Sequence, residues 1–412
     1  MTIIRMLSVL VLSGTVIFQT SGFLYSADAK IKLGLEVLVS KKLDLIKGKR
    51  IGLITNPTGV NSKLQSDIDV LAKIPELKIT ALFGPEHGVR GDAPAGAKIT
   101  FSTDTKTGLP VYSLYGATRS PTPQMLKDVD VLVFNIQDVG ARYYTYIYTM
   151  AQSMKSAKDN GKKFIVLDRP NPLGGLNVEG PVLEPEFSSF IGMYSIPLVH
   201  GMTIGELALL FNEKFDINCD LEVIPMEGWT REMLWDDTGL DWINTSPNIP
   251  TSQTVLLYPC IGFIGELQQV SEGVGTTRPF EYVGAPWVDA DTLADTLNAF
   301  RLPGVYFRPM HYQPFFHIFT KQQVHGVQIH ITNPRTFKPV STGLHILSVL
   351  NNLYGDKIIL PMDNSSGFSK AMGNASTATG LEGNKPAKDI ISSWQEGIDA
   401  FMPVRAKYLL YK

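Results

Sequence analysis

A series of short apolar runs, each ending in a cluster of polar, glycine and proline residues, constrains the fold of this chain most. Ile79 to Phe83 leads into Gly84-Pro85-Glu86-His87-Gly88, and Val129 to Ile136 leads into Gln137-Asp138-Val139-Gly140. Near-continuous apolar strands separated mostly by helices indicate a parallel sheet covered on both faces. The ionisable residues at the strand ends then share one edge, where open α/β sheets bind their ligands.

The same pattern of strands and helices continues along the chain. Strands are predicted over Arg50–Thr55, Pro110–Leu114, Lys163–Leu167 and Leu221–Pro225, and helices over Tyr143–Asp159 and Thr203–Phe215. From about Asp289 a second pattern predicts helices over Asp291–Phe300, Leu344–Tyr354 and Asp389–Met402, and a strand over Val324–Ile331. We therefore expect one domain over residues 30–288 and a smaller α/β domain over residues 289–412.

Between these two patterns, Pro259 to Pro286 is glycine-rich and has no obvious secondary structure. A loop of this length is usually either functional or disordered. Its aromatic residues and threonines favour a functional loop.

The N-terminus has the features of an export signal. Arg5 precedes an apolar stretch from Leu7 to Phe18, and Ala27-Asp28-Ala29 is a small-x-small cleavage site. We expect residues 1–29 to be a signal peptide and the mature protein to be periplasmic or secreted, without stable membrane insertion. A retained membrane anchor is the alternative. The two cysteines, Cys219 and Cys260, are expected to be buried thiols or at most one disulfide.

Several function classes lack their sequence signatures. The net charge is −2 and there is no long basic run, so no nucleic-acid partner is expected. The chain contains no G-x-G-x-x-G after its first strand, no phosphate-binding G-x-x-x-x-G-K-[ST], and neither G-x-S-x-G nor S-x-x-K. It also lacks H-E-x-x-H and a cysteine-rich metal motif, so we expect no cofactor and no metal site.

Of the function classes considered, catalysis by carboxylate side chains remains. Glycoside hydrolysis needs a carboxylic acid to protonate the leaving oxygen and usually a second carboxylate across the sugar. Carboxylates at or beyond strand ends, or in the glycine-rich loop, are Glu86, Asp138, Asp168, Glu179, Glu272 and Glu281. Two alternatives stay open: a periplasmic sugar- or muropeptide-binding protein, and an esterase or amidase with an unrecognised nucleophile.

Longer motifs carry a resemblance to a known family. They are Leu53 to Gly59, Phe83 to Gly88, Gln137 to Tyr146, Leu167 to Pro172, Val178 to Pro181, His200 to Thr203, Ser246 to Pro250, Ser271 to Phe280 and Gly284 to Trp287. In these segments the chain resembles the DUF1343 family, which includes NamZ-like exo-β-N-acetylmuramidases. Val274 departs from the family pattern, in which an arginine is expected.

The resemblance implies a Rossmann-like N-terminal domain, a smaller C-terminal domain and a cleft between them. It also implies release of N-acetylmuramic acid from non-reducing ends of peptidoglycan fragments. Glu86 and Glu179 match the family's proposed catalytic carboxylates. We hypothesise that Glu86 is the general acid and that Glu179 is base, nucleophile or orienting group. Their separation, which sequence does not give, would distinguish retention (about 5–5.5 Å) from inversion (about 6.5–9.5 Å).

Other polar residues of the same motifs are candidates to bind the sugar. Arginine pairs bidentately with carboxylates, so Arg90, Arg142, Arg169 and Arg278 are candidates for the lactyl carboxylate of muramic acid. The remaining expected substrate-binding residues are Asn56, His87, Asp138, Tyr144, Asn171, His200 and Glu272.

Overall fold

A computed structural model describes residues 31–86, 88–91, 102–361 and 363–412. The predicted signal peptide and His87 lie outside these residues. Within the described segments, no helix is both long enough and apolar enough to cross a bilayer.

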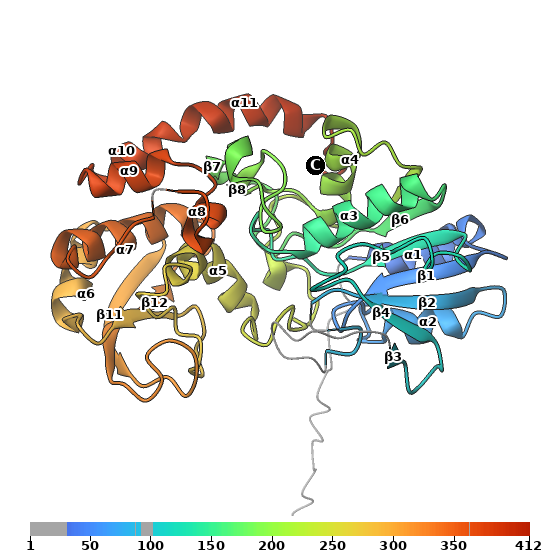
Figure 1. Ribbon diagram of the computed structural model, residues 1–412, viewed down its shortest axis with the longest axis horizontal. Helices are drawn as coiled ribbons and strands as arrows, with labels where there is room; N and C mark the ends of the chain where they lie inside the picture. The colour runs from blue at the N-terminus through green and yellow to red at the C-terminus, as the bar shows by residue number, and fades with distance from the viewer. Residues whose placement is uncertain (1–30, 87, 92–101, 362) are drawn as a thin grey trace, which may run out of the picture.

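The N-terminal part is built on a seven-stranded sheet, which forms the right side of Figure 1. Its strand order is β3-β4-β2-β1-β5-β6-β9, and every neighbouring pair is parallel except β3 and β4. The strands are β1 (Arg50–Thr55), β2 (Lys78–Gly84), β3 (Ser102–Thr103), β4 (Pro110–Ser113), β5 (Val131–Asn135), β6 (Lys163–Leu167) and β9 (Leu221–Ile224). The predicted α/β fold with a mostly parallel sheet is confirmed.

Helices cover both faces of this sheet, which explains why its central strands β1, β5 and β6 are mostly apolar and buried. Successive side chains of a strand point to opposite faces. Phe134 packs under one pair of helices and Val133 under the other. The helices are α1 (Gly34–Lys41) and α2 (Asp67–Ala72) on one face, and α3 (Tyr146–Asp159) and α4 (Ile204–Lys214) on the other.

The C-terminal part contains a three-stranded antiparallel sheet in the order β10-β12-β11, at the left of Figure 1. Its strands are β10 (Tyr282–Ala285), β11 (Val305–Tyr312) and β12 (Val324–Ile331). The helices are α5 (Ser252–Gly265), α6 (Ala290–Ala299), α7 (Pro339–Tyr354), α8 (Gly367–Met372), α9 (Ser376–Glu382), α10 (Ala387–Ser393) and α11 (Gln395–Ala406). Short 3₁₀ turns are η1 (Leu43–Leu45), η2 (Pro185–Phe187) and η3 (Trp235–Asp237).

Helix α5 corrects the prediction of a loop from Pro259 onward. Pro259 lies inside the helix, although proline removes one backbone donor there. The helix forms because it lies in the largest hydrophobic core cluster, where burial of its apolar side chains outweighs the local signal. A β-carbon on Gly343 of α7 would stand 1.8 Å from the Cys260 carbonyl oxygen, so glycine lets the two helices approach closely.

Two predicted helices differ at their ends. Helix α3 begins at Tyr146 rather than Tyr143, because the chain before it pairs with β8 (Pro197–Val199): the Arg142 amide donates to the Leu198 carbonyl at 2.7 Å. The predicted final helix is divided at Trp394 into α10 and α11. Helix α11 packs against β8 and the paired strand β7 (Glu179–Val182), and it runs along the top of Figure 1 toward α4.

Arg142 joins the two parts of the chain and is fully buried. Its guanidinium donates to the carbonyls of Pro181 and Ile196 (2.7 and 2.9 Å) and of Ala371 and Met372 (both 2.7 Å). These contacts give Arg142 a structural role in place of the predicted contact with substrate.

We expect Arg142→Ala to lower the free energy of unfolding by about 3–5 kcal/mol, because four buried carbonyl oxygens lose their donor. Arg335→Ala is the matched control: this exposed arginine pairs with Asp237 at 2.9 Å, and its loss should cost about 1 kcal/mol or less. Urea denaturation of both variants measures the difference. Equal effects would contradict the assigned role of Arg142.

Candidate active site

Three predicted site residues lie side by side at the carboxyl edge of the parallel sheet. Asn56 follows β1, Glu86 follows β2 and Asp138 follows β5. Strand β1 lies between β2 and β5, so two strand spacings separate Glu86 from Asp138. At ~4.8 Å for each spacing, the ends of β2 and β5, which these residues follow, are about 10 Å apart.

Tyrosines surround these two carboxyl groups. Tyr144 and Tyr146 come from the start of α3, and the Tyr258 ring on α5 contacts Tyr144 edge-on at 5.6 Å between centroids. Burial raises the pKa of Tyr146 and the pKa of Tyr258. The negative charges of Glu86 and Asp138 raise both pKa values further. The charges of both carboxylates therefore act on the same two hydroxyls.

Asp138 is a buried carboxyl group, with 6% of its surface exposed. Its Oδ2 accepts from the Gly140 amide at 2.8 Å, whereas its Oδ1 has no hydrogen-bond partner within the part of the chain that the structure describes. Burial raises its pKa to about 7. Near neutral pH this carboxyl can hold a proton, as a general acid must.

The turn that carries Asp138 needs glycine at position 140. Gly140 has φ +81°, and a β-carbon there would stand 2.4 Å from the Asn171 Oδ1. Asn171 is itself fixed, since its amide donates to the Met202 carbonyl at 2.9 Å and its Oδ1 accepts from the Leu173 amide at 2.9 Å. The predicted residue Asn171 thus supports the Asp138 turn.

Glu86 is only partly buried and is held by Tyr115. Burial raises the pKa of Tyr115 to about 12, and both the charge of Glu86 and its hydrogen bond to the hydroxyl add to this shift.

A cavity of about 580 Å³ adjoins Tyr115 and contains a cation that the sequence analysis missed. The Arg119 guanidinium lies 4.3 Å from the centre of the Phe190 ring and, among the described residues, forms no ion pair within 4.0 Å. Lys370 of α8 lines the same cavity. The position of Arg119 in the sequence could have identified it as a site residue. Tyr115 to Arg119 come soon after β4, just as Glu86 comes soon after β2.

Glu179 stands at the start of β7 and pairs with Val199 of β8, which also forms a bridge to Ala141, three residues after Asp138. Its Oε1 accepts from the backbone amide and hydroxyl of Ser341 at 2.6 and 2.5 Å, in the first turn of α7. Burial raises its pKa, and these hydrogen bonds and the charge of Lys338 oppose the shift. Within the described residues the Glu179 Oε2, like the Asp138 Oδ1, has no hydrogen-bond partner.

The other predicted arginines have partners within the protein. Arg169 is buried and donates to the Val60 carbonyl (3.0 Å) and the Asn135 side chain (3.1 Å), which gives it a structural role instead of the predicted one. Arg90 pairs with Asp104 at 2.9 Å and lowers the pKa of that carboxyl to about 2. Arg278 is exposed and pairs with Glu281 at 3.1 Å.

The remaining predicted site residues are buried. Asn56 Oδ1 accepts from the Thr58 amide at 3.0 Å, and Glu272 lies 3.1 Å from the His317 ring. His200 is fully buried, and burial lowers its pKa to about 3, so it stays neutral at the entrance to α4.

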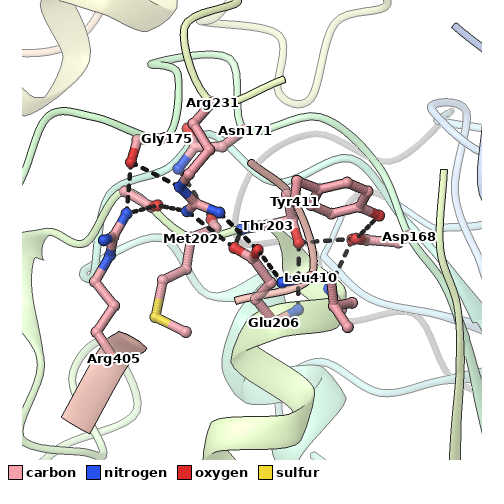
Figure 2. A network of polar contacts seen from close by, with 12 residues as sticks. Asp168, Asn171, Gly175, Met202, Thr203, Glu206, Arg231, Arg405, Leu410 and Tyr411 are labelled. Carbon is pink, nitrogen blue, oxygen red and sulfur yellow. Dashed lines mark hydrogen bonds and ion pairs between the residues drawn. The ribbon is translucent and has the colours of Figure 1, made fainter. Parts of the chain in front are cut away.

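A polar network beside His200 fastens the C-terminus to the sheet domain (Figure 2). Tyr411 donates to Asp168 at 2.5 Å, the Leu410 amide donates to Glu206 at 2.8 Å, and Arg231 pairs with Glu206 at 2.7 Å. Arg405 of α11 donates to the Gly175 carbonyl at 2.5 Å. These contacts fix the C-terminal residues of the chain to the sheet domain.

Cys219 and Cys260 are both free and buried. Within the described ranges, no three His, Cys, Asp or Glu side chains are grouped so that they could hold a metal ion.

Taken together, the site has carboxyl groups at a sheet edge, aromatic side chains around them and a cation in the adjoining cavity. These groups define the class of a glycoside hydrolase that works by acid/base chemistry.

The comparisons with known proteins give the family. Two family models match, "Exo-beta-N-acetylmuramidase NamZ, N-terminal" over residues 51–253 and "Exo-beta-N-acetylmuramidase NamZ, C-terminal" over residues 256–411. The chain is 50% identical over 382 residues to the peptidoglycan beta-N-acetylmuramidase NamZ of Bacillus subtilis (strain 168), covering 93% of this chain and 92% of that protein. The chain belongs to the NamZ family and is a glycoside hydrolase.

Solved structures of DUF1343 family proteins from Bacteroides fragilis NCTC 9343 share the fold. One has a TM-score of 0.87 at 43% identity and covers 94% of this chain and 100% of its own. A second has a TM-score of 0.74 at 30% identity and covers 93% of this chain and 99% of its own. The family models divide the chain between residues 253 and 256, and the boundary expected at residue 288 stays a prediction.

We expect Glu179→Ala to lower the free energy of unfolding by about 1–2 kcal/mol, because α7 loses a side-chain acceptor in its first turn. Glu179→Gln keeps an oxygen that can accept from Ser341 and should recover most of this loss. Chemical denaturation of both variants checks the expectation. Equal destabilisation by the two substitutions would show that the hydrogen bond is not what Glu179 contributes.

Proposed function

We propose that this protein is an exo-acting β-N-acetylmuramidase that releases N-acetylmuramic acid from the non-reducing ends of peptidoglycan fragments. The observation that carries the proposal is 50% identity, over nearly the whole chain, to a peptidoglycan beta-N-acetylmuramidase. The strand-edge carboxyl groups supply the chemistry that such a reaction requires.

In the proposed reaction one carboxyl group protonates the glycosidic oxygen, and a second acts at the anomeric carbon. Glu86 is one member of the pair. The tyrosine rings of Tyr144 and Tyr258 provide apolar faces against which the sugar can pack. The second domain contributes Lys370 of α8 to the cavity beside Tyr115 and places Tyr258 of α5 against Tyr144.

We assign recognition of the lactyl carboxylate to Arg119. This guanidinium lines the cavity beside Tyr115, whose hydroxyl is bonded to Glu86. A carboxylate is the group that distinguishes muramic acid from glucosamine, and guanidinium binds carboxylate through paired charge-assisted hydrogen bonds. In contrast to Arg90, Arg169 and Arg278, Arg119 has its charge available to a ligand.

The site of action is proposed to be the periplasm or the cell exterior. The support is the N-terminal signal pattern of residues 1–29 and the nature of the substrate, which is part of the cell wall.

The mature protein, incubated side by side with chromogenic β-N-acetylmuramide and β-N-acetylglucosaminide, should release the chromophore from the muramide only. Release from the glucosaminide alone would overturn the substrate assignment and leave the hydrolase class intact. Binding without turnover of either compound would favour a sugar-binding protein instead.

Arg119→Gln should raise the KM for the muramide by about 10-fold or more with little change in kcat, because one charged hydrogen-bond donor to the lactyl group is lost. Arg278→Gln is the matched control and should leave KM nearly unchanged. Steady-state kinetics of both variants measures the effect. A KM that rises equally in both would remove Arg119 from substrate recognition.

A further inference from the structure

Two histidines face each other on the three-stranded sheet at the left of Figure 1. The antiparallel register of β11 and β12 places His311 directly opposite His325. Their Nδ1 atoms lie 2.6 Å apart, and their ring centroids lie 4.9 Å apart at an interplanar angle of 74°. At this distance one Nδ1–H donates to the other Nδ1, so the two nitrogens point at each other.

The two rings lie at an open end of the face that α6 covers. Successive side chains of a strand alternate between faces, so His311 shares a face with Phe307, and His325 shares it with Val327. Phe307 and Val327 are buried in the core cluster that includes apolar residues of α6. His311 is nevertheless exposed and His325 is half-buried. A ligand can therefore reach both rings from solvent.

A carboxylate stands beside the pair. Asp289 is the N-cap of α6, and its Oδ1 accepts from the Thr292 amide at 2.8 Å. The hydrogen bonds from Thr292 lower the pKa of Asp289, and positive charge on His311 and His325 lowers it further. The Asp289 charge thus acts on both rings, and it would offset part of the charge of a cation bound between them.

The ligand atoms indicate which cations fit. Imidazole nitrogen suits copper, nickel and zinc, whereas Mg²⁺ and Ca²⁺ prefer oxygen ligands. With metal–nitrogen bonds of ~2.0 Å, two nitrogens stand about 2.8 Å apart at adjacent corners of a square-planar site and about 3.3 Å apart in a tetrahedral one. The separation of 2.6 Å is nearer the square-planar value. Square-planar coordination is typical of Cu²⁺ and Ni²⁺, of which Cu²⁺ binds more tightly.

We propose that His311 and His325 form a two-histidine binding site for a divalent transition-metal ion, with Cu²⁺ the preferred ion. In the metal-bound pair both rings carry their proton on Nε2, which leaves both Nδ1 lone pairs for the metal. Water completes the coordination. A site with two protein ligands agrees with the finding that no three metal-ligating side chains are grouped within the described ranges.

The site goes beyond the proposed hydrolase function. It lies on the three-stranded sheet, whereas Glu86 and Asp138 follow strands of the seven-stranded sheet. A bound ion would tie the edge strand β11 to β12. The sequence analysis expected no metal site because the two histidines are 14 positions apart in the chain and belong to no metal-binding motif. Only the register of the two strands brings them together.

The test is a titration of the untagged mature protein with CuCl₂, followed by isothermal titration calorimetry and by electron paramagnetic resonance. The wild type should bind one Cu²⁺ per chain, and the resonance spectrum should show coupling to two nitrogen nuclei. His311→Ala and His325→Ala should each weaken binding about 10-fold or more. Loss of a group that only supports a ligand already costs ~10–100-fold, and these variants lose a ligand itself.

His330→Ala is the matched control. His330 is a half-buried histidine of the same strand, and its register partner on β11 is Tyr306. This variant should bind Cu²⁺ as the wild type does. A titration of the wild type with MgCl₂ should give no binding signal, because the site offers nitrogen ligands.

A wild type that binds Cu²⁺ with a Kd weaker than about 1 mM would overturn the proposal. So would Cu²⁺ binding that is undiminished in both His311→Ala and His325→Ala, or a loss of equal size in His330→Ala. Circular dichroism checks that each variant is folded. His311→Gln and His325→Gln, which keep a polar side chain, take the place of any alanine variant that does not fold, and the same outcomes then decide.

Discussion

Burial of carboxyl groups along one edge of a parallel sheet is the constraint on which this molecule depends. Burial raises the pKa of Asp67 and of Asp138 to about 7 and that of Asp168 to about 6. Asp67 and Asp168 are each satisfied by the protein, Asp67 through Thr55 at 2.6 Å and Asp168 through Tyr411 at 2.5 Å. Within the described residues, Asp138, Glu179 and Glu272 each keep one carboxyl oxygen without a hydrogen-bond partner. The cost of burying a carboxyl group is thus offset by protein contacts at Asp67 and Asp168 and only in part at these three positions.

The scaffold around this edge is tied together by buried arginines. Arg142 bonds carbonyls of β7 and α8, and Arg405 of α11 bonds carbonyls of the sheet domain. Through these contacts the last residues of the chain belong to the core of the first domain (Figures 1 and 2). A guanidinium suits such a position because it presents several donors in a fixed plane. Helix α5 packs against α7 and α8, and α8 is the helix whose carbonyls Arg142 binds.

The central strands were predictable because full burial makes them continuously apolar, as in Val131 to Phe134 of β5. Helix α5 was not, because Pro259 and nearby glycines are local signals for a loop, and only tertiary burial overrides them. The two motifs that contain Glu86 and Asp138 could be placed at one edge of the sheet from the sequence, because each follows a strand of a parallel sheet. Sequence could not separate arginines bound to backbone carbonyls, such as Arg142, from one that faces a cavity, such as Arg119. That distinction depends on contacts between residues far apart in the chain.

Which two carboxyl groups face the scissile bond is the central question, and a structure of the Glu86→Gln variant bound to a muramic acid–glucosamine disaccharide answers it most directly. The account predicts the side chain at position 86 beside the scissile bond and the lactyl carboxylate within about 3 Å of the Arg119 guanidinium, the distance of a hydrogen bond. The second carboxyl group is then the one, Asp138 or Glu179, whose unpartnered oxygen faces the sugar. A sugar bound away from residue 86, with Arg119 remote from its lactyl group, would contradict the account.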